Sequence, residues 1–551
     1  MLKEHKFLIV ILIIAAVLRF YKLGQIPPSL DWDETAHGYN AYSILKTGRD
    51  EYGYFLPLSF RSFDDYKPPI YTYLVVPSVA VFGLNDFAVR FPSAALGVGA
   101  VLFTYLMVYE LMRIGDRTRS KTIALLSAFF LAISPWHLQF SRVAFETNSA
   151  IFWSVLGTWA FLRGMRKENE KHITGWLSLA AIAFGANLFM YHNARVFIPI
   201  YSLLLIFIFR KKLFENLRYL VLPAIITLVY IAALIPILTS IAGQLRYKGT
   251  TIFADVSPQY AASELIAEDA NSNRLTIGKI MHNRRLVYIP ILIDNYLSHL
   301  KPSYLFQTAD MDRHHAPQVG LLYLWDLPFI LAGMYFLIAK KFDIKTKVII
   351  FWWFLAAPIA SSVTWGVPHS LRSEIYLPTY QIFAAIGVFT IYQTIKNKKS
   401  FFVIASSLLL VNFFFYLHSY YFQMSQEFSK AWLYGRKEAA LFTQSIKNEY
   451  DEVIVSTKIE QGFEFWLYYL KYDPKKYQQV GGTVSGGYFE TGNKFDKYFF
   501  KPFKYESPED EFEKSRTLYV GVPGEFPSVY ESRILKKIYY LNGEPAIFIV
   551  R

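Results

Sequence analysis

The sequence predicts a polytopic α-helical membrane protein that carries a small α/β domain at its C-terminal end. Of its 551 residues, 53% are hydrophobic and only 18% are charged, and the charges cluster in short blocks between long apolar runs. In a soluble chain, about a quarter of the residues are charged. The alternation of apolar runs and charged blocks is therefore typical of a chain that crosses a membrane many times.

Charge and cysteine content exclude several other classes of protein. The net charge is +14, but most basic residues lie in short loops between the apolar runs. Basic residues in such loops set the orientation of a membrane protein, and this explains them better than a nucleic-acid-binding surface does. No nucleic acid is therefore expected as a partner. The chain has no cysteine, which excludes disulfides, thiolate catalysis and cysteine-ligated metals.

Eleven apolar segments are long enough to cross a bilayer, and the count allows eleven to thirteen spans. The first begins after Lys3 and Lys6 and has no small-residue cleavage site behind it, so we expect a retained span rather than a signal peptide. The eleven segments are 6–20, 88–112, 121–140, 144–163, 174–191, 195–210, 218–241, 320–340, 346–364, 378–395 and 400–420.

The short loops between these segments predict the topology. Five of them are rich in Lys and Arg, and such loops belong in the cytoplasm. All five are cytoplasmic only if 68–83, which is short and contains Pro77, dips into or lies along the membrane without crossing it. We therefore expect a multi-pass protein of the plasma (inner) membrane of a prokaryote with a cytoplasmic N-terminus. Its outer segments would be 21–87, 141–147, 191–195, 242–319 and 365–377.

The last part of the chain changes character. The stretches DEVIVST and RTLYVGV have strand patterns, EFWLYYLKY suits a helix or a strand, and NGEPAIFIVR predicts a closing hairpin strand after an Asn-Gly turn. These patterns predict a transmembrane domain over 1–420 and an extracytoplasmic α/β domain over 421–551.

The stretch PPSLDWDETAHGYNAY places three carboxylates, Asp31, Asp33 and Glu34, directly after the first span. The residues that follow Asp33 have helical spacing, so they predict an amphipathic interfacial helix with Asp33 as its N-cap. A helix N-cap needs only one carboxylate. Three carboxylates beside lipid cost free energy unless they are paired with cations or take part in a reaction. A carboxylate at this boundary is suited to take a proton from an acceptor while a lipid-linked donor approaches from the bilayer.

Cationic side chains gather on the same predicted face. Lys67 lies directly before two prolines and an apolar segment, where a lysine either snorkels to the interface or binds a phosphate. Each of the others alone is more often a membrane anchor, but together they suit an anionic lipid-anchored group, because Arg makes forked contacts with phosphate. They are Arg142 with Glu146, His192 with Arg195, Arg313 with His314 and His315, and His369 with Arg372.

A metal site is not predicted here. Adjacent histidines such as His314 and His315 point apart on a strand and lie about 100° apart on a helix, which disfavours their ligating one ion. No cofactor is predicted, although dependence on a divalent cation stays open. The chain also lacks a P-loop, a dinucleotide-type glycine fingerprint, a Gly-x-Ser-x-Gly elbow and a His-Glu-x-x-His motif. A membrane-resident donor is therefore expected instead of a cytoplasmic nucleotide.

Several short motifs, taken in order, resemble a known family. They are the Asp33–Glu34 pair after the first span, Lys67-Pro68-Pro69, FGLNDFAVRFPSA (82–94), SRVAFE (141–146), GLLYLWDLPFILAG (320–333) and PHSLRSEIYLP (368–378). This pattern, over about residues 5–420, resembles the GT-C superfamily of polyprenyl-phosphate-sugar-dependent glycosyltransferases. It is most similar to the branch of bacterial protein O-mannosyltransferases, lipid A aminoarabinose transferases and phospholipid carrier-dependent glycosyltransferases.

The resemblance implies roles for individual residues. Asp33, in the Asp33–Glu34 pair, would be the catalytic base, Lys67 would bind the donor phosphate, and Glu146 would help to organise the site. The roles of His192, Arg195, His369 and Arg372 in binding phosphate are a looser implication. Asp31 lies outside the acidic pair of the family, and spacing alone does not decide between it and Asp33; we prefer Asp33.

The predicted activity is an inverting glycosyl transfer at the outer face of the plasma membrane. The donor would be a sugar on an undecaprenyl- or dolichyl-type phosphate, and the acceptor a protein hydroxyl, a lipid or a cell-wall glycan. One alternative is an oligosaccharide ligase or oligosaccharyltransferase-like enzyme, which Asp310 and Asp312 keep open. The other is a transporter of lipid-linked sugars, which should show ionisable residues near span centres and related halves.

Overall fold

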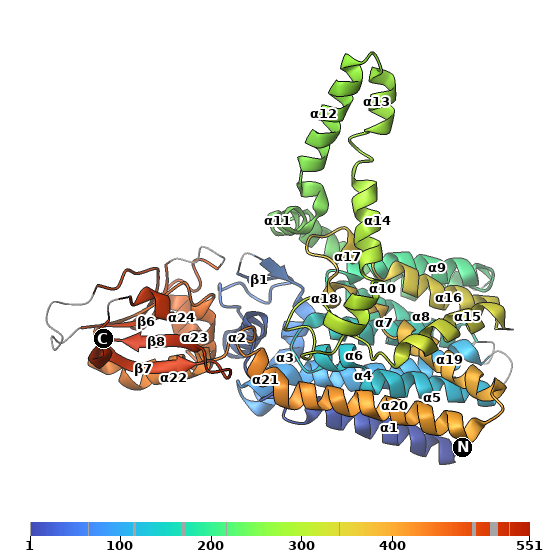
Figure 1. Cartoon of the computed structure of the whole chain (residues 1–551), viewed down its shortest axis with the longest axis horizontal. Coiled ribbons are helices and arrows are strands. Elements are labelled where there is room, and N and C mark those ends of the chain that lie inside the picture. The colour runs from blue at the N-terminus through green and yellow to red at the C-terminus, as the bar shows by residue number, and fades with distance from the viewer. Residues whose placement is uncertain are drawn as a thin grey trace. The chain divides into compact units, whose positions relative to one another are not determined.

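The computed structural model describes residues 2–63, 65–113, 117–166, 171–215, 217–340, 342–486, 492–506, 516–527 and 529–551. The chain folds into two compact units. Unit 1 comprises Met1–Val101, His137–Phe152 and Leu409–Arg551, and unit 2 comprises Leu102–Trp136 and Trp153–Leu408. Figure 1 labels the helices and strands, which are described below one unit at a time.

The N-terminal part of unit 1 is helical except for one small hairpin. Its elements are α1 (Leu2–Phe20), α2 (Trp32–Thr47), β1 (Phe60–Ser62), β2 (Asp65–Lys67), α3 (Pro69–Phe82) and the first part of α4 (Asp86–Met112). Most of α6 (Pro135–Ser141), the start of α7 (Glu146–Gly164) and the end of α20 (Lys398–His418) also belong to this unit.

Among the described residues of unit 2, the regular elements are helices and short helical turns. The longer ones are α5 (Arg117–Ile133), α8 (Ile173–Leu188), α9 (Ala194–Phe214), α10 (Val221–Thr239), α11 (Ile241–Thr250), α12 (Ser257–Asn271), α14 (Tyr288–Ser298), α15 (Asp326–Ala339), α16 (Ile344–Ala356) and α19 (Thr379–Thr394). The shorter ones are α13 (Leu275–Met281), α17 (Ile359–Ser362), α18 (Ser370–Ser373), and the turns η2 (Leu217–Leu220), η3 (Ile252–Ala254), η4 (Tyr304–Thr308) and η5 (Glu374–Tyr376).

Each of the eleven segments predicted to cross the membrane forms a helix or a broken helix. Among the described residues, four helices are long and apolar enough to span a bilayer, or up to six if two sharply bent pairs count as single spans. The helix α3 has 14 residues with Pro77 inside it, and is one of the apolar helices that are shorter than this. The count of eleven and the inside–outside topology stay predictions.

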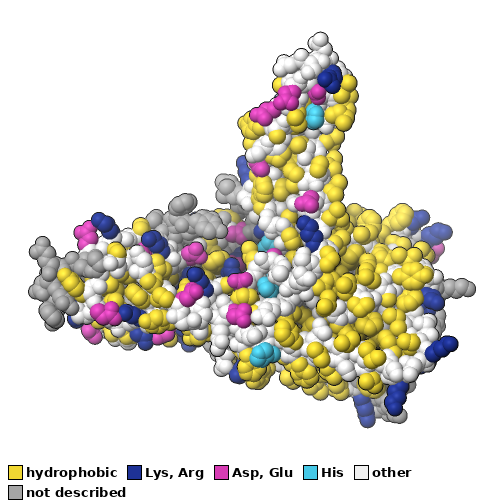
Figure 2. Space-filling model, viewed as in Figure 1, with side chains coloured by type: hydrophobic (Ala, Val, Ile, Leu, Met, Phe, Trp, Pro, Cys, Tyr) yellow, Lys and Arg dark blue, Asp and Glu magenta, His cyan; other side chains and the backbone are white. Residues whose placement is uncertain are grey.

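The surface of the helices supports an integral membrane protein. Large apolar side chains stay exposed along α10 and α20, including Leu228, Ile235, Phe402 and Phe414. Figure 2 shows hydrophobic side chains over much of the helical surface in view, with several Lys and Arg side chains near its edge. A soluble protein rarely exposes such continuous apolar surface, whereas a bilayer covers it.

The C-terminal part of unit 1 contains the predicted α/β structure. Six strands form one mixed sheet in the order β4-β5-β3-β6-β8-β7, with β3 parallel to both β5 and β6. The predicted strands DEVIVST and RTLYVGV are β3 (Glu452–Val455) and β6 (Thr517–Gly521), and EFWLYYLKY lies mostly in α23 (Gly462–Tyr469). The remaining elements are α21 (Met424–Glu427), α22 (Arg436–Ile446), α24 (Pro474–Gln479), β4 (Asn493–Phe495), β5 (Tyr498–Phe500) and the turns η6 (Ser419–Gln423), η7 (Lys447–Glu449), η8 (Pro523–Glu525) and η9 (Glu531–Arg533).

The predicted closing hairpin is confirmed. Strand β7 (Ile534–Tyr539) pairs antiparallel with β8 (Pro545–Val550), and Gly543 in the turn between them has φ +89°. This backbone conformation favours glycine, which explains the Asn-Gly sequence of the turn.

Candidate active site

The acidic stretch after the first span forms the N-terminus of α2. Its N-cap is Asp31, whose Oδ1 accepts a hydrogen bond from the Asp33 backbone N–H at 2.9 Å. The prediction that Asp33 caps the helix was wrong: Asp33 is the second residue of the helix. Asp31 was the better cap because Glu34, three residues later, completes a capping box by accepting the Asp31 N–H at 3.0 Å.

The helix α2 is buried on more than one side. Residues Glu34–Ala41, together with Ser43 and Ile44, are all buried, so the expected division into an apolar and a polar face is not present. Its C-terminus is closed by Gly48, which has φ +70°, a conformation that favours glycine at the end of a helix. The burial holds the first turn of α2 in one orientation.

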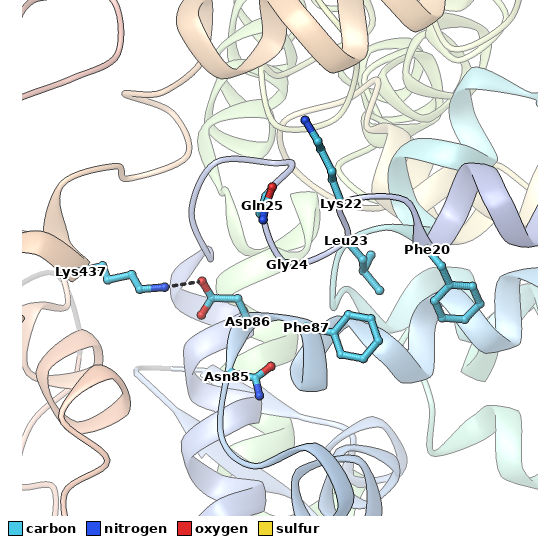
Figure 3. A pocket seen from close by; sticks show the side chains of 9 residues that line it. All are labelled: Phe20, Lys22, Leu23, Gly24, Gln25, Asn85, Asp86, Phe87 and Lys437. Atoms are coloured by element: carbon cyan, nitrogen blue, oxygen red, sulfur yellow. Dashed lines mark hydrogen bonds and ion pairs between the residues drawn. The ribbon is translucent and has the colours of Figure 1, made fainter.

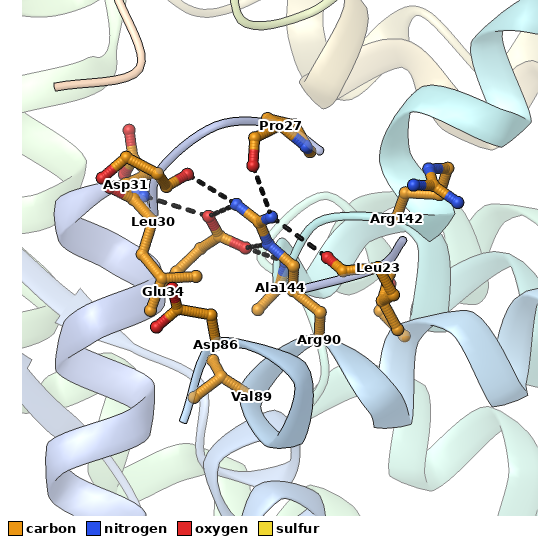
Figure 4. Close-up of polar contacts among 12 residues, drawn as sticks. Leu23, Pro27, Leu30, Asp31, Glu34, Asp86, Val89, Arg90, Arg142 and Ala144 are labelled. Carbon is orange, nitrogen blue, oxygen red and sulfur yellow. Dashed lines mark hydrogen bonds and ion pairs between the residues drawn. The ribbon is translucent and has the colours of Figure 1, made fainter. Parts of the chain in front are cut away.

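Glu34 is fully buried and is held by Arg90 of α4. The Arg90 guanidinium donates from Nε to Glu34 Oε1 and from Nη2 to Oε2, both at 2.8 Å (Figure 4). The same arginine donates to the carbonyl oxygens of Leu23, Pro27 and Ser29, and the Ala144 N–H donates to Glu34 Oε1 at 2.8 Å. These bonds tie the loop before α2 to α4.

Lys67 stands where a short strand meets a helix. Strands β1 and β2 pair antiparallel, with Phe60 opposite Lys67, and α3 begins two residues later. Pro68 and Pro69 provide the N-cap and the first residue of α3, where proline is favoured because its fixed φ suits the helix and no N–H is needed. This junction fixes the backbone from which the buried Lys67 side chain extends.

Asp33 and Lys67 form an ion pair. The Lys67 Nζ lies 2.8 Å from Asp33 Oδ1. The two side chains differ in exposure: that of Asp33 is 32% exposed and that of Lys67 only 10%. The carboxylate therefore remains partly open to an approaching molecule, whereas the lysine side chain is more deeply buried.

Glu146, the first residue of α7, is buried close to this pair. Its Oε1 lies 3.2 Å from His37 Nε2, and the positive charge of Lys67 also acts on its carboxylate. In the tautomer that donates Nε2–H to Glu146, His37 Nδ1 accepts the Thr72 hydroxyl at 2.8 Å. The side chains of Asp33, Lys67, Glu146 and His37 thus lie in one connected polar cluster.

Arg142 is buried, and its guanidinium donates hydrogen bonds to oxygen atoms of this chain. Its guanidinium donates to the carbonyl oxygens of Leu18, Arg19, Tyr21 and Ile26 and to the hydroxyl of Tyr420. These contacts hold the end of α1 and the turn that follows it. Arg142 therefore anchors the backbone that leads into the acidic stretch.

The C-terminal part of unit 1 also packs on α2. The side chain of Gln478 donates to Ser43 Oγ, Thr47 Oγ1 and the Asp50 carbonyl. The Thr483 hydroxyl donates to Glu51 Oε2 at 2.7 Å, and a Cβ on Gly38 of α2 would lie 2.5 Å from the Tyr468 ring. The helix that carries Asp33 is therefore supported by residues more than 400 positions later.

Two buried carboxyl groups lie at this contact. Asp50 Oδ1 accepts the backbone N–H groups of Tyr52 and Tyr54, but its Oδ2 is buried without a hydrogen-bond partner within the described residues. Burial raises the pKa of Asp50 to about 6, against the effect of these backbone hydrogen bonds. Burial also raises the pKa of Glu51.

An open pocket of about 390 Å³ lies elsewhere in unit 1 (Figure 3). Its lining includes the ion pair between Lys437 Nζ and Asp86 Oδ2, 3.2 Å apart, and the aromatic rings of Phe20 and Phe87. None of the predicted site residues lines it. The pocket alone therefore does not mark the predicted chemistry.

Unit 2 contains a second cluster of predicted site residues. Asp310 Oδ2 lies 2.9 Å from His314 Nδ1 and 3.6 Å from His369 Nδ1. Burial alone would raise the pKa of Asp310, but the charges of His314 and His369 and the Ser370 hydrogen bond outweigh it and hold that pKa well below its usual range. Burial also holds the pKa of His369 well below its usual value.

The other predicted residues of unit 2 have contacts of their own. Arg195 donates to the Leu188 carbonyl and contacts His192 Nδ1 at 2.9 Å, and Arg372 donates to Thr364 Oγ1 and the Trp365 carbonyl. His315 Nδ1 donates to the Ala316 carbonyl, and Arg313 is half-buried. Their predicted role in binding phosphate stays a prediction.

Sequence reasoning identified Asp33, Lys67 and Glu146, which the structure brings together in unit 1. It missed His37 and Arg90. His37 lies four residues after Asp33, one helical turn away, which was a usable signal for a shared face. Arg90 was inside a motif quoted for the family resemblance, but nothing in the sequence pairs it with Glu34, 56 residues earlier.

Comparisons with known proteins agree with the predicted resemblance. Residues 9–247 match the family model described as dolichyl-phosphate-mannose-protein mannosyltransferase. The chain is 26% identical over 166 residues to YkcB of Bacillus subtilis (strain 168), which is provisionally named a mannosyltransferase. It is also 29% identical over 178 residues to an uncharacterized protein of Aquifex aeolicus (strain VF5). These alignments cover 29% and 32% of this chain but only 21% and 32% of the two relatives.

The fold is similar to that of a protein of known structure. The crystal structure of ArnT from Cupriavidus metallidurans in the apo state matches with a TM-score of 0.52 and 11% identity, covering 99% of this chain and 98% of that one. At this identity the likeness concerns the fold. Together with the family model, it confirms the predicted GT-C resemblance and the predicted helical membrane fold with a small C-terminal sheet region.

Proposed function

We propose that this chain is an inverting glycosyltransferase that moves a sugar from a polyprenyl phosphate to an acceptor at the outer face of the plasma membrane. Asp33 is the general base and Lys67 binds the donor phosphate. The observation that carries the proposal is the Asp33–Lys67 ion pair of 2.8 Å, with the base partly exposed and the lysine side chain more deeply buried. The N-terminus is cytoplasmic, and residues 421–551 form an extracytoplasmic domain.

The donor class is supported by the relatives. The matching family model is described by dolichyl-phosphate-mannose, and ArnT of Cupriavidus metallidurans bound to undecaprenyl phosphate matches this chain with a TM-score of 0.50 over 98% of its length. Both molecules carry a phosphate on a long isoprenoid. We therefore expect a sugar linked through one phosphate to such a lipid, with the lipid tail in the bilayer.

One base and one cation are sufficient for this reaction. The acceptor oxygen forms a bond to the sugar C1 while the bond from C1 to the phosphate oxygen breaks, and the electron pair leaves with the polyprenyl phosphate. The phosphate needs no protonation to depart, because it is already a weak base, and Lys67 stabilises its developing second negative charge. Asp33 takes the acceptor proton. Attack opposite the leaving group inverts the configuration at C1.

The ion pair also couples donor binding to the availability of the base. Before the donor binds, Lys67 neutralises Asp33 at 2.8 Å. A phosphate that approaches Lys67 competes for the same ammonium group. Once Lys67 contacts the phosphate, Asp33 loses its partner and is free to accept the proton of the acceptor.

The neighbouring groups have supporting roles. Glu146 lies within the field of Lys67 and is held by His37, so it orients the ammonium from the buried side. Glu34, although part of the acidic pair, is fully buried and bound in two places by Arg90. We therefore assign Glu34 a positioning role and leave Asp33 as the base.

The test uses full-length protein in detergent with synthetic polyprenyl-phosphate sugars, and measures sugar transfer or release. Asp33→Asn should lower kcat by about 10²–10⁴-fold, the usual contribution of a general base. The matched control is Asp31→Asn, because asparagine caps a helix as well as aspartate does and removes a carboxylate two residues away. Undiminished turnover in Asp33→Asn, or an equal loss in both variants, would reject Asp33 as the base.

A further inference from the structure

The Asp310 cluster of unit 2 has the donor atoms of a metal site. One ligand atom from each of Asp310, His314 and His369 lies within 4.8 Å of the others. Two ligands on one tetrahedral zinc ion, bound at about 2.0–2.1 Å, lie roughly 3.3–3.4 Å apart. The distances of 2.9 and 3.6 Å from Asp310 Oδ2 to the two Nδ1 atoms lie on either side of this value.

The carboxylate of this cluster is already oriented. Ser370 donates from its backbone N–H to Asp310 Oδ2 at 3.1 Å and from its hydroxyl to Oδ1 at 2.5 Å. Metal-binding carboxylates are commonly held by such outer hydrogen bonds, which fix the direction of the ligand. The bonds also join the loop around 310 to the start of α18.

The His369 ring supplies a second, independent sign of a ligand. Its Nδ1 is buried and has no hydrogen-bond partner within the described part of the chain; Asp310 Oδ2, at 3.6 Å, is too far for a hydrogen bond. Buried polar atoms of this kind require an explanation, and one explanation is an absent ion. A metal between Nδ1 and the carboxylate would satisfy both.

The backbone before Asp310 is strained in the same place. Ala309 has φ +50° and follows the π-helical turn η4. A residue with a side chain is disfavoured at such φ values, and both features are common at functional sites. The strain lies directly beside Asp310 and contributes to its direction.

We propose that Asp310, His314 and His369 bind one divalent transition-metal ion. Two imidazoles and one carboxylate suit zinc or iron(II), and disfavour magnesium and calcium, which prefer oxygen ligands. The nearby His299 is not a ligand: its Nδ1 donates to the Asn295 carbonyl and its Nε2 contacts Ser361 Oγ at 2.8 Å. Three protein ligands leave a position for water or another small ligand.

This site has a structural consequence for unit 2. The ion would link the loop that carries Asp310 and His314 to the loop that carries His369, which are about 55 residues apart in sequence. A ligand that binds only the folded state stabilises that state by mass action. Metal should therefore raise the unfolding temperature of the protein as well as bind to it.

The experiment measures metal binding without donor or acceptor, so its outcome is independent of glycosyl transfer. Full-length protein with its affinity tag removed is treated with EDTA and titrated with Zn²⁺, Fe²⁺, Mn²⁺ or Mg²⁺ by calorimetry. Bound metal is counted by elemental analysis. We expect one Zn²⁺ or Fe²⁺ per chain, no tight Mg²⁺ binding, and at least a hundredfold weaker Zn²⁺ binding in His369→Ala and in His314→Ala.

The matched control is His282→Ala. His282 Nε2 and Asp269 Oδ2 are also 3.6 Å apart, but among the described residues no third His, Asp or Glu completes a ligand set with this pair. This variant should keep wild-type affinity. In EDTA, all variants should unfold within a few degrees of the wild type, and zinc should raise the unfolding temperature only of the wild type and His282→Ala.

Two results would overturn the proposal. One is the absence of stoichiometric Zn²⁺ or Fe²⁺ binding at micromolar concentration. The other is equal binding by the wild type, His314→Ala and His369→Ala. If His369→Ala unfolds early in EDTA, Asp310→Asn decides. The asparagine amide can still accept one Ser370 hydrogen bond through its oxygen and donate to the Ser370 hydroxyl oxygen through its nitrogen, but the anionic ligand is lost.

Discussion

The Lys67 ammonium lies 2.8 Å from Asp33 Oδ1, so the proposed base and the proposed phosphate ligand are partners before any donor arrives. The two residues come from different elements, the first turn of α2 and the end of β2. Each position is fixed separately, by the capping box on one side and by two prolines on the other. Substitutions at either residue can therefore measure the proposed exchange, in which Lys67 leaves Asp33 and contacts the donor phosphate.

Lys67→Ala should weaken donor binding and leave acceptor binding little changed. Loss of a hydrogen bond to a charged group costs about 1.5–3 kcal/mol, so we expect the KM for the donor to rise about 10- to 150-fold. Lys67→Arg keeps the charge with a different shape and should fall between the wild type and Lys67→Ala. Steady-state kinetics with the donor varied at fixed acceptor measures the effect. Donor KM unchanged in Lys67→Ala would contradict the phosphate contact.

His37 and Glu146 should act as one unit. His37→Ala and Glu146→Gln each remove one side of a 3.2 Å contact, so the second substitution should add little to the first. We expect a coupling energy of about 0.5–3 kcal/mol in a double-mutant cycle on kcat/KM, the range for residues in contact. Additive effects would mean that His37 influences the reaction by another route.

Arg90→Ala should destabilise the protein strongly. It leaves Glu34 buried without its two guanidinium bonds, and removal of one partner of a buried ion pair costs about 3–5 kcal/mol. Unfolding in mild detergent, followed by intrinsic fluorescence, measures the loss.

Addition of Glu34→Gln to Arg90→Ala provides the control. The double variant no longer buries a lone charge, so it should recover part of the lost stability. A double variant that is less stable than Arg90→Ala would show that the charge of Glu34 is not the cause.

Asp50→Asn should stabilise the protein at neutral pH. Burial raises the pKa of Asp50 from 3.8 to about 6, so the folded state favours the protonated carboxyl, and stability is lost as pH rises from about 4 through 6. Asparagine resembles the protonated form and keeps an oxygen for the Tyr52 and Tyr54 N–H groups. The unfolding temperature of Asp50→Asn should exceed that of the wild type at pH 7, and the difference should shrink towards pH 4. A difference that stays constant with pH would contradict the role of this ionisation.

The sequence predicts the fold well where local signals are strong. Apolar runs mark the helices, and the Asn-Gly pair at 542–543 marks the closing hairpin, because each depends on neighbouring residues alone. Strands β4 and β5 were missed since each has only three residues. The start of α2 was predicted two residues too late. Both Asp31 and Asp33 are suitable N-caps, and the capping box with Glu34 selects Asp31.

The site is less accessible to sequence reasoning because its contacts are long-range. Asp33 and Lys67 are 34 positions apart and were found through order and resemblance. The contact between Asp310 and His369 joins residues that are 59 positions apart. No local spacing in the sequence indicates that these two side chains meet. The sequence argument considered His314 and His315 as a pair and predicted no metal site, because adjacent histidines point apart. In the structure His314 contacts Asp310, whereas His315 donates to the Ala316 carbonyl.

The contacts of Gln478 with α2 and of Thr483 with Glu51, just after α2, impose an order in time on a nascent chain. The ribosome delivers Asp33 early, but the residues that fix its helix emerge only after more than 400 further positions. At about 5–20 residues per second, that interval is roughly 20–90 s. Throughout it, the acidic helix lacks a full set of neighbours. A chain cut short in synthesis would thus carry every proposed catalytic side chain and still be without the support that orients the first of them.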